Sequence, residues 1–134
     1  MKYFSPTTSG WSTKVNFVDE NNVFVGYDFS NECCESFGWY VSDTLEHAKE
    51  GVAEFDDTFD TDIINAKIES FRFDKQFFEE ENEDKDYDVN STVIFRLFNE
   101  SKELFLVLYN SHNGYYSHGF EFIDNQTVIR EGSL

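Results

Sequence analysis

The sequence predicts one domain over residues 1–134 of the α+β class, mostly β: a twisted, antiparallel, meander-like sheet with one short helix. Three observations predict this fold. Apolar and polar residues alternate over several short runs. Turn-forming residues such as Asn-Asn and Asn-Gly separate these runs. A composition of 40% hydrophobic and 19% aromatic residues is sufficient for a single core in 134 residues.

The first expected element is a hairpin over residues 13–29. Val23, Val25, Tyr27 and Phe29 alternate on one face of its second strand. Between the strands, Asn21 and Asn22 tolerate the positive φ that a tight turn requires. A bend and a short strand are expected over residues 33–41.

A short helix is expected next. Asp43 and Glu46 have the spacing of a capping box, with Asp43 as the N-cap, and Gly51 is expected to end the helix. Residues 54–62 are acidic and are expected to be irregular.

The remaining elements are all expected to be strands. Residues 64–73 alternate with a phase slip near Ser70, which predicts a bulge. An acidic insertion follows over residues 74–88. Residues 92–98 and 104–109 are apolar on both faces, as in a central hairpin. Strands over residues 115–123 and 127–130 complete the sheet.

The charge is the most distinctive property of the sequence. There are 27 Asp and Glu residues against 10 Lys and Arg residues, which gives a net charge of −17. Because nucleic acids and anionic lipids carry the same sign, we expect neither as a direct partner. No apolar run reaches the length of a membrane span, and residues 1–11 lack the pattern of a secretory signal. A cytoplasmic location is therefore expected, which is the host cell cytoplasm if the protein is encoded by a phage.

The negative charge is concentrated in two blocks. Residues 43–62 contain eight acids and one lysine, and residues 74–88 contain eight acids and two lysines. These blocks could imitate the phosphates of a nucleic acid and occupy a basic groove of another protein. They could instead be solvated loops that keep the protein soluble. Under the first interpretation, the predicted partner-binding residues are Asp56, Asp57, Asp60, Asp62, Glu79, Glu80, Glu81, Glu83 and Asp84.

The first block also has a partial likeness to a calcium-binding loop. Asp56, Thr58, Asp60 and Asp62 occupy the first, third, fifth and seventh positions of an EF-hand-like pattern. The sixth position is Thr61 instead of Gly, and the twelfth is Lys67 instead of Glu. We therefore predict at most weak cation binding here, and no metal site.

Two local motifs have no evident role. The first is Cys33-Cys34-Glu35. Its adjacent thiols lack the spacing of a structural zinc site, and the neighbouring acids disfavour a reactive thiolate. We expect one thiol to pack as a small apolar group.

The second motif is Asn113-Gly114-Tyr115-Tyr116-Ser117, preceded by His112 and followed by His118. Asn113-Gly114 predicts a turn, and the following strand would place His118 on an apolar face with Phe120 and Phe122. A histidine in that position is more often an interior residue than a ligand or base. No third orienting group or oxyanion hole can be named for a nucleophilic pair, so we expect no catalytic residue.

These two motifs resemble those of a family of small, uncharacterised bacterial and phage proteins. Its pattern has an N-terminal hairpin, D-C-C-E, a short helix ending in Gly and, later, S-N-G-Y-Y-S. The counterparts here are residues 31–35, 43–51 and 111–117. Glu32 replaces the family's Asp, His112 is inserted, and residues 74–88 are not covered. The resemblance implies a phage or mobile-element setting, no established activity, and proximity of the two motifs in the fold.

The sequence therefore predicts a non-catalytic, cofactor-free interaction protein of phage type. We expect it to bind a basic surface of a host nucleic-acid-binding protein, of the CRISPR or restriction type, and to inhibit it. One alternative is a small metal- or ligand-binding protein that uses Cys33, Cys34, His112 and His118. The other is an accessory interaction domain whose acidity serves only solubility.

Overall fold

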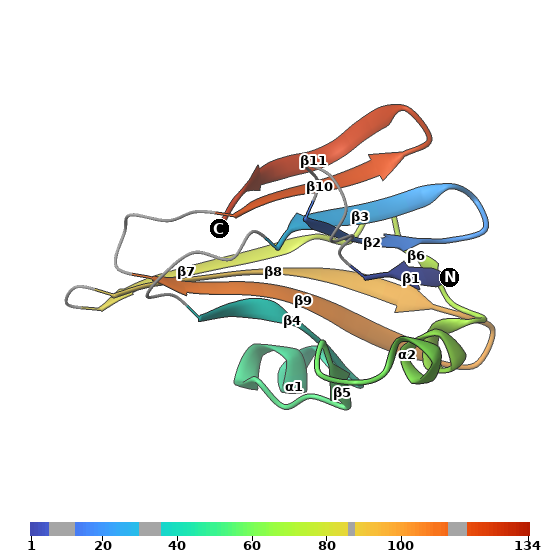
Figure 1. The fold of residues 1–134 in the computed structure, drawn as a ribbon, viewed down its shortest axis with the longest axis horizontal. Coiled ribbons are helices and arrows are strands. Elements are labelled where there is room, and N and C mark those ends of the chain that lie inside the picture. The colour runs from blue at the N-terminus through green and yellow to red at the C-terminus, as the bar shows by residue number, and fades with distance from the viewer. Residues whose placement is uncertain (6–12, 30–35, 86–87, 113–117) are drawn as a thin grey trace.

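The computed structural model of the protein describes residues 1–5, 13–29, 36–85, 88–112 and 118–134. It is mostly β, with two antiparallel sheets and two short helices (Figure 1). The predicted fold class is therefore confirmed, although the strands divide into two sheets. Within the described part of the chain, neither helix is long and apolar enough to span a bilayer.

The first sheet contains five strands in the order β1-β2-β3-β10-β11. The predicted hairpin of residues 13–29 is confirmed, and its turn includes Asn22 with a φ of 62°. Asn125 has a φ of 60° in the turn between β10 and β11. The strands are β1 (Lys2–Phe4), β2 (Lys14–Val18), β3 (Val23–Asp28), β10 (Gly119–Asp124) and β11 (Thr127–Ser133).

The second sheet has the order β5-β4-β9-β8-β6, and β7 also pairs with β8. The predicted central hairpin is confirmed as β8 and β9, which pair over ten positions. Its strands are β4 (Ser36–Ser42), β5 (Phe55–Asp56), β6 (Arg72–Phe73), β7 (Glu79–Lys85), β8 (Asp88–Phe98) and β9 (Glu103–His112).

The main core lies between the two sheets. Alternate side chains of the central strands β2, β3, β4, β8, β9 and β10 point into it, as the twofold periodicity of strands requires. Trp39 of β4 is fully buried and meets Phe17 of β2 edge-on, with ring centroids 5.0 Å apart. Phe95 of β8 packs in the same way against Phe122 of β10, at 5.0 Å. Many of the phenylalanine side chains therefore form aromatic contacts between the two sheets.

The first helix, α1 (Leu45–Glu50), lies on the outer face of the second sheet, where Ala48 packs against Ile94, Phe105 and Val107. Its N-cap is Thr44, whose hydroxyl accepts a hydrogen bond from the amide of His47, 3.0 Å away. The prediction of Asp43 as N-cap was wrong by one residue, because Asp43 contacts the His47 ring instead. Gly51 ends the helix as predicted, with a φ of 77°.

The second helix, α2 (Thr61–Ile68), overturns the predicted strand over residues 64–73. Asp60 caps it by accepting a hydrogen bond from the amide of Asp62. Ile64 and Ile68 are buried and lie four residues apart, on one face of the helix, whereas Ala66 is exposed. A separation of four residues fits the periodicity of a helix and also that of a strand. After α2, the predicted segment contains only the two-residue strand β6. Residues 54–62 are not irregular either, since they contain β5 and the beginning of α2.

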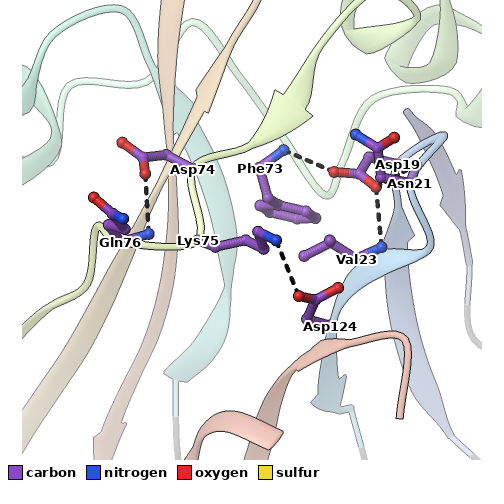
Figure 2. A network of polar contacts seen from close by, with 8 residues as sticks. All are labelled: Asp19, Asn21, Val23, Phe73, Asp74, Lys75, Gln76 and Asp124. Carbon is purple, nitrogen blue, oxygen red and sulfur yellow. Dashed lines mark hydrogen bonds and ion pairs between the residues drawn. The ribbon is translucent and has the colours of Figure 1, made fainter. Parts of the chain in front are cut away.

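A polar network connects the two sheets at their turns (Figure 2). The buried carboxylate of Asp19 accepts hydrogen bonds from the amides of Asn21, Val23 and Phe73, at 2.9 to 3.0 Å. Beside it, Lys75 donates to Asp124 of the first sheet at 3.0 Å. The turn between β2 and β3 is therefore fixed to β6 by one side chain.

Candidate functional site

Acids from both blocks border the same face of the second sheet. In an antiparallel pair, residues that face each other in register point to the same side. Asp56 of β5 is in register with Tyr40 of β4, and Glu79 and Glu81 of β7 are in register with Ile94 and Thr92 of β8. These side chains point away from the main core, to the face that α1 partly covers.

Two rows of residues cross this outer face. One runs from Glu81 through Thr92 and Tyr109 to Gly38, and the next runs from Glu79 through Ile94, Val107 and Tyr40 to Asp56. With strands about 4.8 Å apart, β7 and β4 are separated by roughly 14 Å. We call this outer surface, bordered by Asp56, Asp57, Glu79 and Glu81, the acidic face.

The acidic face contains a hollow of about 410 Å³ between the strands and the segment that follows α1. Tyr40 and Tyr109 lie in it, with ring centroids 5.9 Å apart. We call it the tyrosine hollow. It is lined on the strand side by Tyr40, Tyr109, Asn90, Thr92 and Ser111, and on the other side by Gly51, Ala53 and Asp56.

Gly38 leaves room for two of the polar groups at this site. A methyl group added to its Cα would collide with the Asp57 carboxylate and would lie 2.8 Å from the Tyr109 hydroxyl oxygen. Both groups therefore lie directly over the backbone of β4. A side chain at residue 38 would displace them.

Burial and negative charge change the ionisation of these groups. Burial raises the pKa of Asp57 above its ordinary value; the nearby charge of Asp56 also raises it, and a hydrogen bond with the Trp39 backbone opposes the change. Burial also raises the pKa of Tyr109, and Asp57 and Asp56 add to the effect. The pKa of Tyr40 is raised by burial, then by Tyr109 and Glu81. At each of these three groups, negatively charged neighbours therefore add to the effect of burial.

One lysine partly compensates the charge at the β7 border. The Lys49 ammonium of α1 lies 2.9 Å from a Glu79 carboxylate oxygen and 3.9 Å from one of Glu81. All three side chains are partly exposed, so these ion pairs contribute little stability. These ion pairs nevertheless connect α1 with β7.

Other predicted partner-binding acids lie elsewhere. Asp60 caps α2 and Asp62 lies in its first turn, and Figure 1 places this helix toward the end of the long axis opposite to β7. Glu80 is exposed but is in register with Val93, so it points to the other side of the sheet. Glu83 and Asp84 belong to β7, and their side chains lie outside the described part of the structure.

The residues of the calcium-like pattern have structural partners. Asp56 accepts hydrogen bonds from the amide and hydroxyl of Thr58, and Asp60 caps α2. Among the described residues, no group of three or more His, Cys, Asp or Glu side chains could hold a metal ion.

Most of the two local motifs cannot be placed. Cys33, Cys34 and Glu35, and residues 113–117, lie outside the described residues, as does the side chain of His112. His118 is fully buried, as predicted. Its Nδ1 atom lies 2.8 Å from the Asp28 carbonyl oxygen, and its ring stacks on Phe37 at 4.1 Å.

Sequence reasoning missed Gly38, Tyr40 and Tyr109. The signal was present, because Trp39 and Val41 alternate with Gly38, Tyr40 and Ser42, and the second set must therefore point outward. What the sequence could not provide was the pairing that places Tyr109 opposite Gly38.

Comparison with known proteins gives one family and no closer relative. The model of a family described as "Domain of unknown function (DUF7448)" matches residues 7–122. No curated protein and no solved structure matches the chain.

Proposed function

Because the chain belongs to the DUF7448 family, whose description gives no activity, we propose a function from the geometry of the acidic face. The protein is a non-catalytic interaction protein that binds a basic surface of a partner protein through this face. The membership agrees with the expectation of a family without an established activity, and the two sequence motifs and the phage setting remain part of the proposal.

One observation supports this function above the others. Acids that are distant in the sequence, Asp56 and Asp57 on one side and Glu79 and Glu81 on the other, border one face of one sheet. A surface of a single sign speeds the approach of an oppositely charged partner and selects against partners of like charge.

The row of like charges along β7 also favours a partner that normally binds nucleic acid. Residues 79–85 contain five acids and one lysine. Only alternate residues of a strand share a face, so neighbouring carboxylates of one face are about 6.8 Å apart, and they form a row of like charges as the phosphates of one nucleic-acid strand do. We therefore propose that the partner is a host nucleic-acid-binding protein, of the CRISPR or restriction type, which this protein inhibits by occupying its basic groove.

An affinity capture from host lysate tests the proposal. The protein is immobilised, and captured proteins are compared at low and high salt. We expect a basic partner that is retained at low salt and released at high salt, since screening weakens attraction between charged surfaces. The triple variant Asp56→Asn, Glu79→Gln, Glu81→Gln is expected to lose most of this capture.

The matched control removes three charges elsewhere: Glu20→Gln, Glu69→Gln and Glu131→Gln, all at exposed positions. This variant is expected to retain the partner. Equal loss of partner capture in both triple variants would mean that capture depends only on the total charge, and it would overturn the role of the acidic face. Undiminished capture by the first variant would overturn the proposal and favour an accessory domain whose acidity serves solubility.

A further inference from the structure

We propose that the tyrosine hollow is a binding site for a guanidinium group, and that an arginine of the partner occupies it. The inference rests on the proposed function, because it names the side chain through which a basic partner is anchored. It concerns a specific pocket, whereas the proposed function concerns the charge of a whole face.

The shape of the hollow fits a long side chain with a flat end. The volume of the hollow is about 410 Å³. This is more than ten times the volume that one water molecule occupies in the liquid, which is about 30 Å³. The Tyr40 and Tyr109 rings are tilted by 43° to each other. A planar cation can stack on an aromatic ring of this kind, at a centroid distance up to about 6 Å.

The lining of the hollow is rich in hydrogen-bond acceptors. Asp56 supplies a carboxylate, and Asn90, Thr92 and Ser111 supply side-chain oxygens. The Asp57 carboxylate lies outside this lining, over Gly38 and next to the Tyr109 hydroxyl, and adds negative charge beside the hollow. A guanidinium group has five N–H donors in a rigid fork and no acceptor, so it can use several of these oxygens at once.

The charge of the hollow is not compensated from within. None of the described residues that line it is a lysine or an arginine. Lys49, the nearby cation, is directed to Glu79 and Glu81 on β7. The raised pKa values of Asp57, Tyr40 and Tyr109 agree with this, because each has a negative neighbour among its causes. A bound cation would stabilise the ionised carboxylates.

A guanidinium group fits better than an ammonium group for two reasons. It is more weakly hydrated, so its transfer into a half-buried hollow costs less. Its flat shape also matches the aromatic walls, whereas an ammonium group is compact and needs water or oxygen ligands on all sides. The hollow should therefore prefer arginine to lysine.

Chemical-shift titration of the isotope-labelled protein tests the inference directly. The probe is N-acetyl-L-arginine methylamide, and its control is the citrulline analogue, which has nearly the same shape without the charge. We expect saturable shifts from arginine, centred on the amides of Tyr40, Thr92 and Tyr109. The lysine analogue should bind more weakly, and the citrulline analogue should not saturate.

Two variants sharpen the test. Asp56→Asn, at the carboxylate that lines the hollow, keeps the shape of the side chain and is expected to weaken arginine binding about tenfold, as expected for loss of one charge-assisted hydrogen bond. Tyr109→Leu should weaken it by a similar factor through loss of stacking. Asp62→Asn removes an exposed acid from α2 and should leave it unchanged. Thermal unfolding of each variant verifies that it is folded.

The outcomes separate this inference from the proposed function. The proposed arginine site would be overturned by either of two results. One is that the arginine analogue changes chemical shifts in all acidic segments, and the other is that the arginine and citrulline analogues bind equally well. Salt-sensitive capture of a partner would then still support the proposed function. If arginine binds in the hollow but no basic partner is captured, the pocket stands and the proposed function fails.

Discussion

At the acidic face, the Asp57 side chain lies where its ionised form does not favour the folded state. Asp57 is half-buried beside another acid, and its raised pKa means that the folded state holds its proton more tightly than the unfolded chain does. Residues whose burial opposes their charged state are common at binding sites. The effect of Asp57 on stability can be measured in the protein alone.

The pH dependence of Asp57 has a definite sign. Below its ordinary pKa of 3.8, the carboxyl is protonated in both states and its contribution is most favourable. As the pH rises from there through the folded pKa, the folded state releases this proton later, so stability falls. We expect Asp57→Asn to reduce this slope and to raise the free energy of unfolding at pH 7 by less than about 1 kcal/mol, since half the group is solvated.

Urea unfolding between pH 3 and pH 7 measures this effect. Asp62→Asn, at an exposed position on α2, serves as the control for removal of one surface carboxylate. A loss of stability at pH 7 in Asp57→Asn would show that the carboxylate is structural.

Residue by residue, the sequence predicted what periodicity determines. The burial of Val23, Val25 and Tyr27 follows from alternation in β3, and that of His118 from the apolar neighbours two and four residues later. The role of Asp19 could not be predicted, because one of its three amide partners, Phe73, is 54 residues away. Thr44 replaces Asp43 as N-cap because both are good caps and only the helix start decides between them.

At the scale of elements, α2 is the clearest failure of prediction. Ile64 and Ile68 face the core in either a helix or a strand, and the β-branched residues of this segment favour a strand. The alternatives differ at Ala66, which would face the core in a strand but is exposed in α2. Asp60 is a good N-cap residue and so was a signal for a helix start, but the charge pattern predicts a partner-binding role for it instead.

Substitutions in α2 verify this assignment. Ile68→Ala should reduce the free energy of unfolding by about 2–4 kcal/mol, because it removes fully buried atoms from the core. Ala66→Glu should change it by less than about 0.5 kcal/mol. Denaturant titration of both variants gives the comparison. A large loss for Ala66→Glu would contradict the helix.

For the whole molecule, the dominant property is a net charge of −17 that folding compresses into a small volume. The sequence predicted strand content and antiparallel pairing but one sheet instead of two. The division depends on contacts between distant strands, such as β3 with β10, which local patterns do not contain. The meeting of both acidic blocks on one face has the same origin, since it depends on β4 pairing with the distant strand β9.

Like charges on one compact molecule repel each other, so stability should depend on salt. We expect the melting temperature to rise by roughly 2–6 °C when sodium chloride is added to low-salt buffer, because screening reduces the repulsion. The triple variant of the acidic face should show a smaller rise. Calorimetry at several salt concentrations tests this, and sodium sulfate is avoided because it strengthens apolar burial by a different route. A fall in melting temperature would mean that the surface ion pairs outweigh the repulsion.

Strand β7 has a further consequence for the behaviour of the protein at high concentration. Among the described residues it pairs only with β8, so its other side presents unpaired backbone groups. Such a strand is a template on which a second copy can add its own strand, and so can begin aggregation. The carboxylates of Glu79, Glu80 and Glu81 would meet those of the approaching copy and repel it. The charges that we propose for partner binding should therefore also oppose pairing between two copies of β7.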